Sequence, residues 1–206
     1  GKEITENSSL SLKELAGYKV VKSMPASGYY AGYKVYVSTP PTGGITMLQT
    51  LSMSEKMNLS ELSHNSSDYI ALLAAITQVT YNDRLSTIAD PAFYKVDQLM
   101  ITSSAYMDQL MNEARLIKHF DELQVDDATG NLEDDENTTH IVVYDETGMM
   151  VSLTNTLTQF FGTGRSAGGF FLNNHMDNFS SNPKSLNAPE TGKRPRSFIS
   201  PAILEK

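Results

Sequence analysis

The sequence predicts an α+β fold, because helical patterns dominate the middle of the chain and strand-like patterns dominate its C-terminal part. Between about residues 44 and 119, apolar residues recur at the three- and four-residue spacing of a helix. From Thr138 onward the chain turns β-rich, beginning with a β-branched strand. An acidic stretch without periodicity, residues 122–137, separates the two parts. Such segregation is typical of the α+β class, and the acidic stretch is expected to be an exposed, mobile loop.

The composition limits the classes of function. A chain of 206 residues with 40% hydrophobic content can build one sizeable domain or two small ones. The formal net charge of -8 argues against a nucleic-acid binder, which needs a basic surface. No apolar run is long enough for a membrane span. The chain has no cysteine, and its four histidines lack close metal-ligand spacing, so we expect neither a metal nor another cofactor.

The first part of the chain carries short predicted elements. Residues 1–9 are polar and predict a frayed end. Residues 10–20, LSLKELAGYKV, predict a short helical turn closed by a glycine and leading into a strand. Apolar and polar side chains alternate over residues 33–38, which predicts a half-buried strand that Pro40 and Pro41 end.

Three longer helices are expected next. The first opens at Gly43-Gly44, where a simple strand-to-helix turn is favoured over an anion site. Asp68 is the expected cap of the second helix, which carries one apolar face. The third covers about Ser104 to His119, with methionines that fill its core-facing side.

The remainder of the chain predicts strands. THIVVYD and MMVSLTNT flank the turn ETG and predict a hairpin, and GGFFLNN predicts a further strand. Near the end, Ile199, Ala202 and Ile203 predict a strand that enters a sheet whose other strands lie elsewhere.

Thr138 stands where the acidic loop meets the hairpin. A threonine hydroxyl is a poor nucleophile without a base, but an N-terminal threonine can use its own α-amine. An α-amino pKa of roughly 7.7–8.0 suits this work near neutral pH. The amine becomes free only if the Asn137–Thr138 bond is cut, and the same hydroxyl can attack the Asn137 carbonyl. A loop followed by two threonines is alone a weak signal, since most such pairs simply begin a strand.

Five short motifs in register add to this signal. They are TTH at 138–140, TNT at 154–156, FGTG at 161–164, FFLNNHMDNF at 170–179 and GKRPRSFISP at 192–201. In this order they resemble the opening of the small subunit of the γ-glutamyltranspeptidases, which are N-terminal-nucleophile hydrolases. GYKVYVSTPPTGG, YNDR and ADP upstream resemble the end of that family's large subunit.

The resemblance implies part of a four-layer αββα sandwich. It assigns residues 1–137 to the C-terminal part of a large subunit that ends in a processing loop. Residues 138–206 become the N-terminal part of the small, catalytic subunit. The remaining parts of both subunits are the implied partners, and they carry an oxyanion Gly-Gly pair and a carboxylate-binding arginine. The 206 residues alone are therefore expected to be inactive and unprocessed.

The resemblance also implies a role for individual residues. Thr138 is the nucleophile and the first residue after autoprocessing, and Thr156 orients it. Thr158 contacts the end of the substrate that carries the α-amino and carboxylate groups. His175 stands where the family usually has glutamine or glutamate, and Ser197 matches a serine that binds the α-carboxylate. Outside the two threonines 138 and 156, the alternative is that these polar groups only satisfy nearby backbone.

Departures from the family pattern bear on the substrate. Phe198 replaces a second serine, and Asn178 replaces an aspartate that pairs with the free α-ammonium of glutathione-type donors. An asparagine cannot neutralise a cation, but an internal unit of a γ-linked glutamate polymer has an amide there. Arg196, in a basic stretch, is expected to hold a further carboxylate. The substrate favoured is therefore poly-γ-glutamate, as in the capsule-depolymerising branch of the family, with glutathione as the alternative.

The sequence leaves two other hypotheses for the function open. The chain can be a non-catalytic relative that binds γ-glutamate, or an acylase of the same superfamily that acts on a different amide. The family implies a location outside a bacterial cell or in its envelope.

Overall fold

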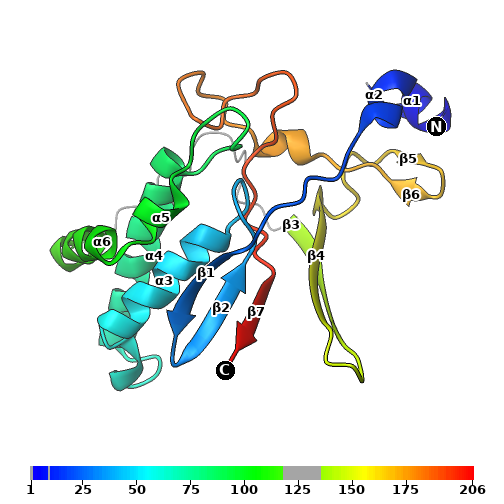
Figure 1. Ribbon diagram of the computed structural model, residues 1–206. Helices are drawn as coiled ribbons and strands as arrows, with labels where there is room; N and C mark the ends of the chain where they lie inside the picture. Colours follow the sequence, from blue (N-terminus) through cyan, green and yellow to red (C-terminus); the bar gives the residue numbers. More distant parts are fainter. Residues whose placement is uncertain (1, 9, 118–135) are drawn as a thin grey trace. The chain divides into compact units, whose positions relative to one another are not determined.

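The computed structural model describes residues 2–8, 10–117 and 136–206 (Figure 1). The chain divides into two compact units, and each unit is built from two separate stretches of the sequence. One unit contains Gly1–Met24 and Asn131–Asp177, and the other contains Pro25–Gly130 and Asn178–Lys206. Helices and strands occur in both units, which agrees with the predicted α+β class.

The second unit contains a three-stranded antiparallel sheet in the order β1-β2-β7 (Figure 1). Its strands are β1 (Ala26–Tyr30), β2 (Tyr33–Val37) and β7 (Ala202–Glu205). The alternation that predicted β2 reports burial, because Val35 and Val37 are both in the core. The C-terminal strand was predicted correctly at Ala202 and Ile203, but Ile199 lies before it, and the strand pairs with β2 of this chain.

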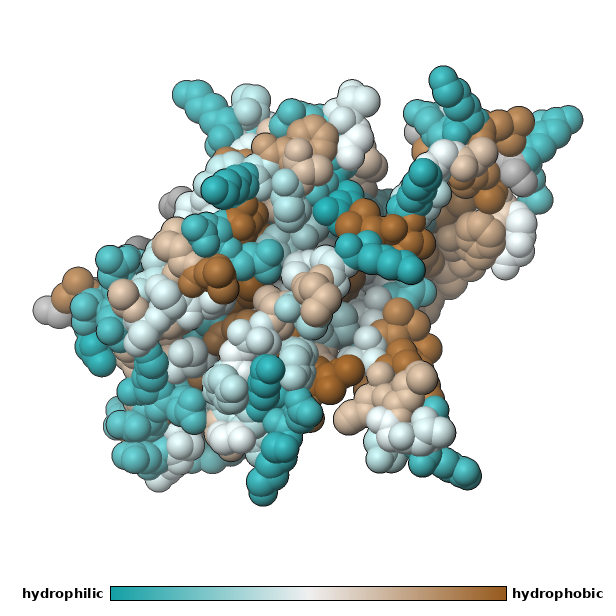
Figure 2. All heavy atoms as spheres, in the orientation of Figure 1, coloured by the Kyte–Doolittle hydropathy of each residue, from teal (hydrophilic) through white to brown (hydrophobic). Residues whose placement is uncertain are grey.

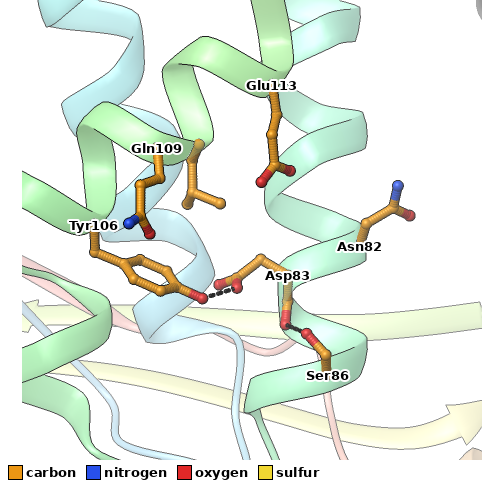
Figure 3. A pocket seen from close by; sticks show the side chains of 7 residues that line it. Asn82, Asp83, Ser86, Tyr106, Gln109 and Glu113 are labelled. Carbon is orange, nitrogen blue, oxygen red and sulfur yellow. Dashed lines mark hydrogen bonds between the residues drawn. The ribbon is translucent and has the colours of Figure 1, made fainter.

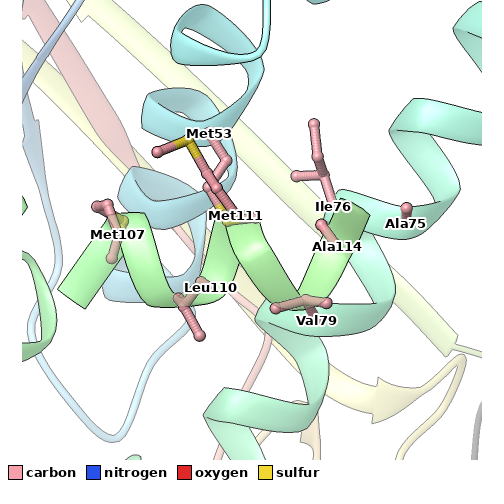
Figure 4. Packing of buried hydrophobic residues seen from close by; sticks show 8 residues of the cluster. All are labelled: Met53, Ala75, Ile76, Val79, Met107, Leu110, Met111 and Ala114. Carbon is pink, nitrogen blue, oxygen red and sulfur yellow. The ribbon is translucent and has the colours of Figure 1, made fainter. Parts of the chain in front are cut away.

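Helices α3 (Gly44–Lys56), α4 (Ser67–Thr87) and α6 (Ser104–Leu116) form the rest of this unit. Helix α3 packs on β1 and β2, and α4 and α6 pack on α3 and on each other. Their shared core is shown in Figure 4 and consists of Met53, Ala75, Ile76, Val79, Met107, Leu110, Met111 and Ala114. The methionines are core residues, as predicted. The short helices η1 (Leu59–Glu61) and α5 (Gln98–Ile101) complete the unit.

One predicted helix cap differs from the structure, and one predicted helix end lies outside the described residues. Ser66, and not Asp68, caps α4, because the Ser66 hydroxyl accepts the Tyr69 amide at 3.2 Å. Asp68 lies in the first turn instead, where a carboxylate favours the positive end of the helix dipole. Helix α6 ends at Leu116, and the predicted end at His119 lies outside the described residues.

Gly43 and Gly44 are required by close packing at the start of α3. A Cβ on Gly44 would lie 2.0 Å from the Ser38 carbonyl oxygen, and one on Gly43 would lie 2.7 Å from the Phe198 carbonyl oxygen. The Gly43 amide also donates to the Ile199 carbonyl at 3.0 Å. These contacts support the turn interpretation, and they hold residues 198–199 against the helix start.

The first unit contains the predicted hairpin and several short elements. The hairpin consists of β3 (Glu136–Tyr144) and β4 (Met150–Gln159). The smaller elements are α1 (Lys2–Asn7), α2 (Leu12–Gly17), the pair β5 (Ser166–Ala167) and β6 (Phe170–Phe171), and η2 (His175–Asn178), which continues into the second unit.

Three predictions for these short elements were wrong or incomplete. Residues 2–7 form a helix where a frayed end was expected, and this helix contacts β5. No strand follows α2 directly, since the next strand starts at Ala26. Of GGFFLNN, only Phe170–Phe171 is a strand, because Gly168 and Gly169 both take positive φ angles in the tight turn before it.

The hairpin carries apolar side chains that are open to solvent, and hydrophobic surface is visible along it in Figure 2. Ile141, Val142, Val143 and Leu153 are each about half exposed or more. No helix in the described part of the chain is long and apolar enough to cross a membrane. Most of the expected mobile loop, residues 122–135, lies outside the described residues.

Candidate active site

Thr138 is the third residue of β3, because the strand begins at Glu136, two residues earlier than predicted. It lies directly opposite Thr156 on β4, and His140 lies opposite Thr154. Side chains two residues apart on a strand share a face, so these four side chains form one polar patch of the hairpin. Thr138 itself is exposed.

The Thr156 hydroxyl lies between two backbone groups. It donates to the Asn137 carbonyl oxygen at 3.1 Å and accepts the Thr158 amide at 2.9 Å. A hydroxyl has one proton, so the bond from the amide leaves that proton for the carbonyl. This carbonyl belongs to the Asn137–Thr138 peptide bond. A donor at this position polarises the carbonyl toward attack.

A bulge in β4 brings Thr158 to this hydroxyl. Thr138 pairs with Thr156, but Glu136 pairs with Gln159, so β4 has one extra residue here. Thr158 lies in the bulge with φ of 75°, a left-handed conformation that is strained for a β-branched residue. Its buried side chain places Oγ1 2.9 Å from Nδ1 of His175. The structure therefore brings Thr158 and His175 together.

Asn174 holds the bulge from the neighbouring segment. Its side-chain oxygen accepts the Gln159 backbone amide at 3.1 Å, and its backbone amide donates to the Leu157 carbonyl at 3.1 Å. Asn174 was not among the predicted site residues. The only signal was a pair of asparagines next to an apolar run.

Asn178, Arg196 and Ser197 lie in the second unit, where Asn187 joins two of them. The Asn178 side chain donates to the Arg196 carbonyl at 3.4 Å. Asn187 donates to the Asn178 carbonyl at 2.6 Å and accepts the Arg196 amide at 2.8 Å. Sequence reasoning missed Asn187, because a single asparagine in a polar loop carries no pattern.

The basic stretch GKRPRSF is held by partners inside its own unit. Arg196 is 3% exposed, and its guanidinium donates to the Arg84 carbonyl at 3.1 Å, in the last turn of α4. Arg194 pairs with the buried Asp90 at 2.7 Å, and Lys193 pairs with Glu190 at 2.8 Å. The stretch therefore has a structural role in this unit, and a contact between Arg196 and substrate stays a prediction.

The pair formed by Asp90 and Arg194 sets the charge state of the carboxylate. Burial acts to raise the pKa of Asp90, but hydrogen bonds from the side chain and backbone of Arg194 hold this pKa below its usual value. The ion pair joins the segment after α4 to the loop that precedes Ser197.

Ser197 and Phe198 follow this anchor. The Ser197 hydroxyl accepts the Ile199 amide at 3.3 Å, and the Ser197 amide donates to the Pro41 carbonyl at 3.1 Å. The Phe198 ring lies 3.9 Å from the Arg84 guanidinium and nearly parallel to the Tyr81 ring. Hydrogen bonds to nearby backbone groups thus explain the conformation of Ser197, and its contact with substrate stays a prediction.

A polar pocket of about 300 Å³ opens between α4 and α6 (Figure 3). The Tyr106 hydroxyl donates to Asp83 there, and the Gln49 amide donates to the same carboxylate at 2.7 Å. Burial and the bond to Asp83 raise the pKa of Tyr106. None of the predicted site residues lines this pocket, and the described residues contain no group of three or more potential metal ligands.

The fold defines the class to which the chain belongs. It resembles the crystal structure of cephalosporin acylase from Bacillus halodurans, with a TM-score of 0.74 and 21% sequence identity. The likeness covers 99% of this chain and 36% of that one. The prediction of an N-terminal-nucleophile hydrolase fold is thereby confirmed.

Within that class, the pattern of the Gamma-glutamyltranspeptidase family matches residues 2–206, and the chain belongs to this family. The Capsule biosynthesis protein CapD proenzyme of Bacillus anthracis is 37% identical over 203 residues, which are 98% of this chain and 36% of that protein. The Glutathione hydrolase proenzyme of Escherichia coli (strain K12) is 35% identical over 218 residues, with 99% and 38% covered. The chain thus spans little more than a third of the length of either relative.

Proposed function

We propose that this chain carries the nucleophile of an enzyme that transfers or hydrolyses γ-glutamyl groups. The Asn137–Thr138 bond is cut first, and Thr138 then acts as an N-terminal nucleophile. The observation that carries the proposal is the Thr156 hydroxyl, which donates to the carbonyl of that bond. The names of both relatives support it, because each is a proenzyme.

We expect this cleavage to proceed in two steps. The Thr138 hydroxyl oxygen attacks the Asn137 carbonyl carbon, while Thr156 stabilises the negative oxygen that develops. The carbon–nitrogen bond then breaks, and the hydroxyl proton ends on the Thr138 nitrogen. Water hydrolyses the resulting ester, which leaves a carboxylate on Asn137 and a free α-amine on Thr138.

Turnover uses the same hydroxyl. The new α-amine accepts the hydroxyl proton, and the oxygen attacks the γ-carbonyl of the donor to form a γ-glutamyl ester. The donor's amine leaves with a proton, and water or another amine takes the γ-glutamyl group. Thr156 orients the nucleophile, and Thr158 with His175 contacts the α-end of the glutamyl group. Neither step requires a metal ligand from this chain.

The substrate favoured is a γ-linked glutamate polymer. Overall identity does not decide between the two relatives, at 37% and 35%. Asn178 does distinguish the two substrate classes chemically, because it is a neutral amide and cannot neutralise the free α-ammonium group of a glutathione-type donor. Ser197 is the proposed contact for the α-carboxylate. The same reasoning favours a place outside the cell or in the envelope of a bacterium, where a capsule polymer occurs.

The test compares kcat/KM for glutathione and for a γ-glutamate oligomer in the full-length protein. Wild type is expected to prefer the oligomer. Asn178→Asp restores a charge partner and is expected to shift the ratio toward glutathione by about ten- to a hundredfold. Asn182→Asp adds the same charge to an exposed residue of the same loop and is the control. If wild type prefers glutathione and Asn178→Asp does not change the ratio, the polymer substrate is contradicted. The protein is then a glutathione-type transferase.

A further inference from the structure

The His140 imidazole bridges two hydroxyl groups on the neighbouring strand. Its Nδ1 lies 2.8 Å from Thr154 Oγ1, and its Nε2 lies 3.4 Å from Ser152 Oγ. A neutral imidazole has one donor and one acceptor nitrogen, and a hydroxyl can fill either complementary role. Both ring nitrogens therefore have partners on β4, which fixes the ring against that strand.

This bridge lies beside the proposed nucleophile. His140 shares a face of β3 with Thr138, and its partner Thr154 is two residues from Thr156, the residue opposite Thr138. The His140–Thr154 pair is thus the next cross-strand pair after Thr138–Thr156 on that face of the hairpin.

Cleavage changes what holds Thr138. In the intact chain, the strand is held on its N-terminal side by the Glu136–Gln159 pairing and by the bond from Thr156 to the Asn137 carbonyl. If the bond before Thr138 is cut, Glu136 and Asn137 belong to a separate polypeptide, and Thr138 becomes the end of a strand. Strand ends fray unless something holds them.

We infer that His140 is a positioning residue, whose bridge to Thr154 holds the newly formed N-terminal strand in register for turnover. The inference rests on the proposed function. It assigns His140 no contact with substrate and no proton transfer. Its distinctive consequence is that the bridge matters more after cleavage than before, because the intact strand has support on both sides.

The experiment measures autocleavage rate, kcat and KM in the full-length protein. His140→Ala removes the bridge, and Thr154→Val removes the hydroxyl while keeping a β-branched strand residue. Each is expected to lower kcat about tenfold, to slow cleavage less than about threefold and to leave KM nearly unchanged. His140→Asn places an amide near the position of Nδ1 and is expected to restore most of kcat. Asn155→Ala, on the opposite face of β4 and exposed, is the matched control.

The outcomes separate this inference from the proposal beneath it. Equal losses in cleavage and turnover, or wild-type kcat in folded Thr154→Val, would overturn the positioning role of His140. If His140→Ala does not fold, Thr154→Val and His140→Asn decide the question. If Thr138→Ala is still cleaved normally, the proposed function itself is contradicted.

Discussion

Thr158 has the most strained backbone among the predicted site residues. Its φ of 75° is unfavourable for a β-branched side chain, at a cost of roughly 1–2 kcal/mol. The contacts of Asn174 to both neighbouring residues hold this conformation in place. Strain of this kind persists where the surroundings impose it, and here it brings the Thr158 amide to Thr156.

Substitutions at Thr158 separate strain from hydrogen bonding. Thr158→Asn is expected to raise the free energy of unfolding by about 1 kcal/mol, because asparagine tolerates a left-handed backbone. Thr158→Val keeps the β-branch and loses the bond to His175, so it is expected to lower that free energy by about 1 kcal/mol. Urea denaturation of both variants measures the two effects. A stabilised valine variant would contradict this account of the site.

Thr156 makes a second prediction at this scale. Thr156→Val keeps the side-chain shape but removes the donor to the Asn137 carbonyl, and cleavage is expected to slow about a hundredfold. Thr139→Val, on the other face of the hairpin, is the control. Electrophoresis of the full-length protein over time measures the cleaved fraction. A valine variant that is cut at the wild-type rate would show that this hydroxyl does not stabilise the developing charge.

At the scale of elements, the Asp90–Arg194 pair anchors the loop that leads to Ser197. Arg194→Ala is expected to lower the free energy of unfolding by about 2 kcal/mol, less than for a fully buried pair because the Arg194 side chain is 43% exposed. Lys2→Ala removes an exposed ion pair with Glu6 and is expected to change the free energy of unfolding little. Thermal unfolding at neutral pH compares the two. Equal small effects would rule out an anchoring role.

This ion pair also predicts a dependence on pH. The pKa of Asp90 is lower in the folded chain than its unfolded value of about 3.9, so the unfolded state binds the proton first as pH falls. The contribution of Asp90 is complete above that value and is lost as pH falls through the folded pKa. The difference in melting temperature between wild type and Asp90→Asn is therefore expected to shrink below about pH 4. A difference that stays constant down to pH 2 would contradict the assignment.

Helices α4 and α6 are joined by a polar contact between Tyr106 of α6 and Asp83 of α4. Because the pKa of Tyr106 is raised in the folded chain, its contribution is complete below about pH 10 and is lost above it. Tyr106→Phe is expected to lower the free energy of unfolding by about 1–2 kcal/mol at neutral pH and by less at pH 11. Chemical denaturation at both values measures this, with Tyr18→Phe, at an 80% exposed residue, as the control.

At the scale of the whole chain, the periodic elements were predictable and the contacts between segments were not. Side-chain alternation identified β2, because that pattern records burial directly, and β-rich segments around a turn identified the hairpin. Helix α1 was missed, since its six residues are mostly polar and it contacts β5, far away in sequence. The cap of α4 was misplaced by two residues, because Ser66, Ser67 and Asp68 are all suitable cap types.

The candidate site follows the same division. Thr138 and Thr156 were predicted from a resemblance to a family, and the hairpin register places them opposite each other. The bulge at Thr158 left no trace in the sequence, because threonine is an ordinary strand residue. Asn174 and Asn187 each link segments that are separate in the sequence, so no local sequence pattern predicts their contacts.

The central claim is that Thr138 becomes an N-terminus and acts as the nucleophile that creates it. N-terminal sequencing of the full-length protein, with intact masses of all its polypeptides, tests this most directly. Wild type is predicted to yield a smaller polypeptide that begins Thr-Thr-His at Thr138. Thr138→Ser is predicted to give partial cleavage at the same bond, and Thr138→Ala a single uncut chain. Cleavage at another bond, or unchanged cleavage in Thr138→Ala, would contradict the account.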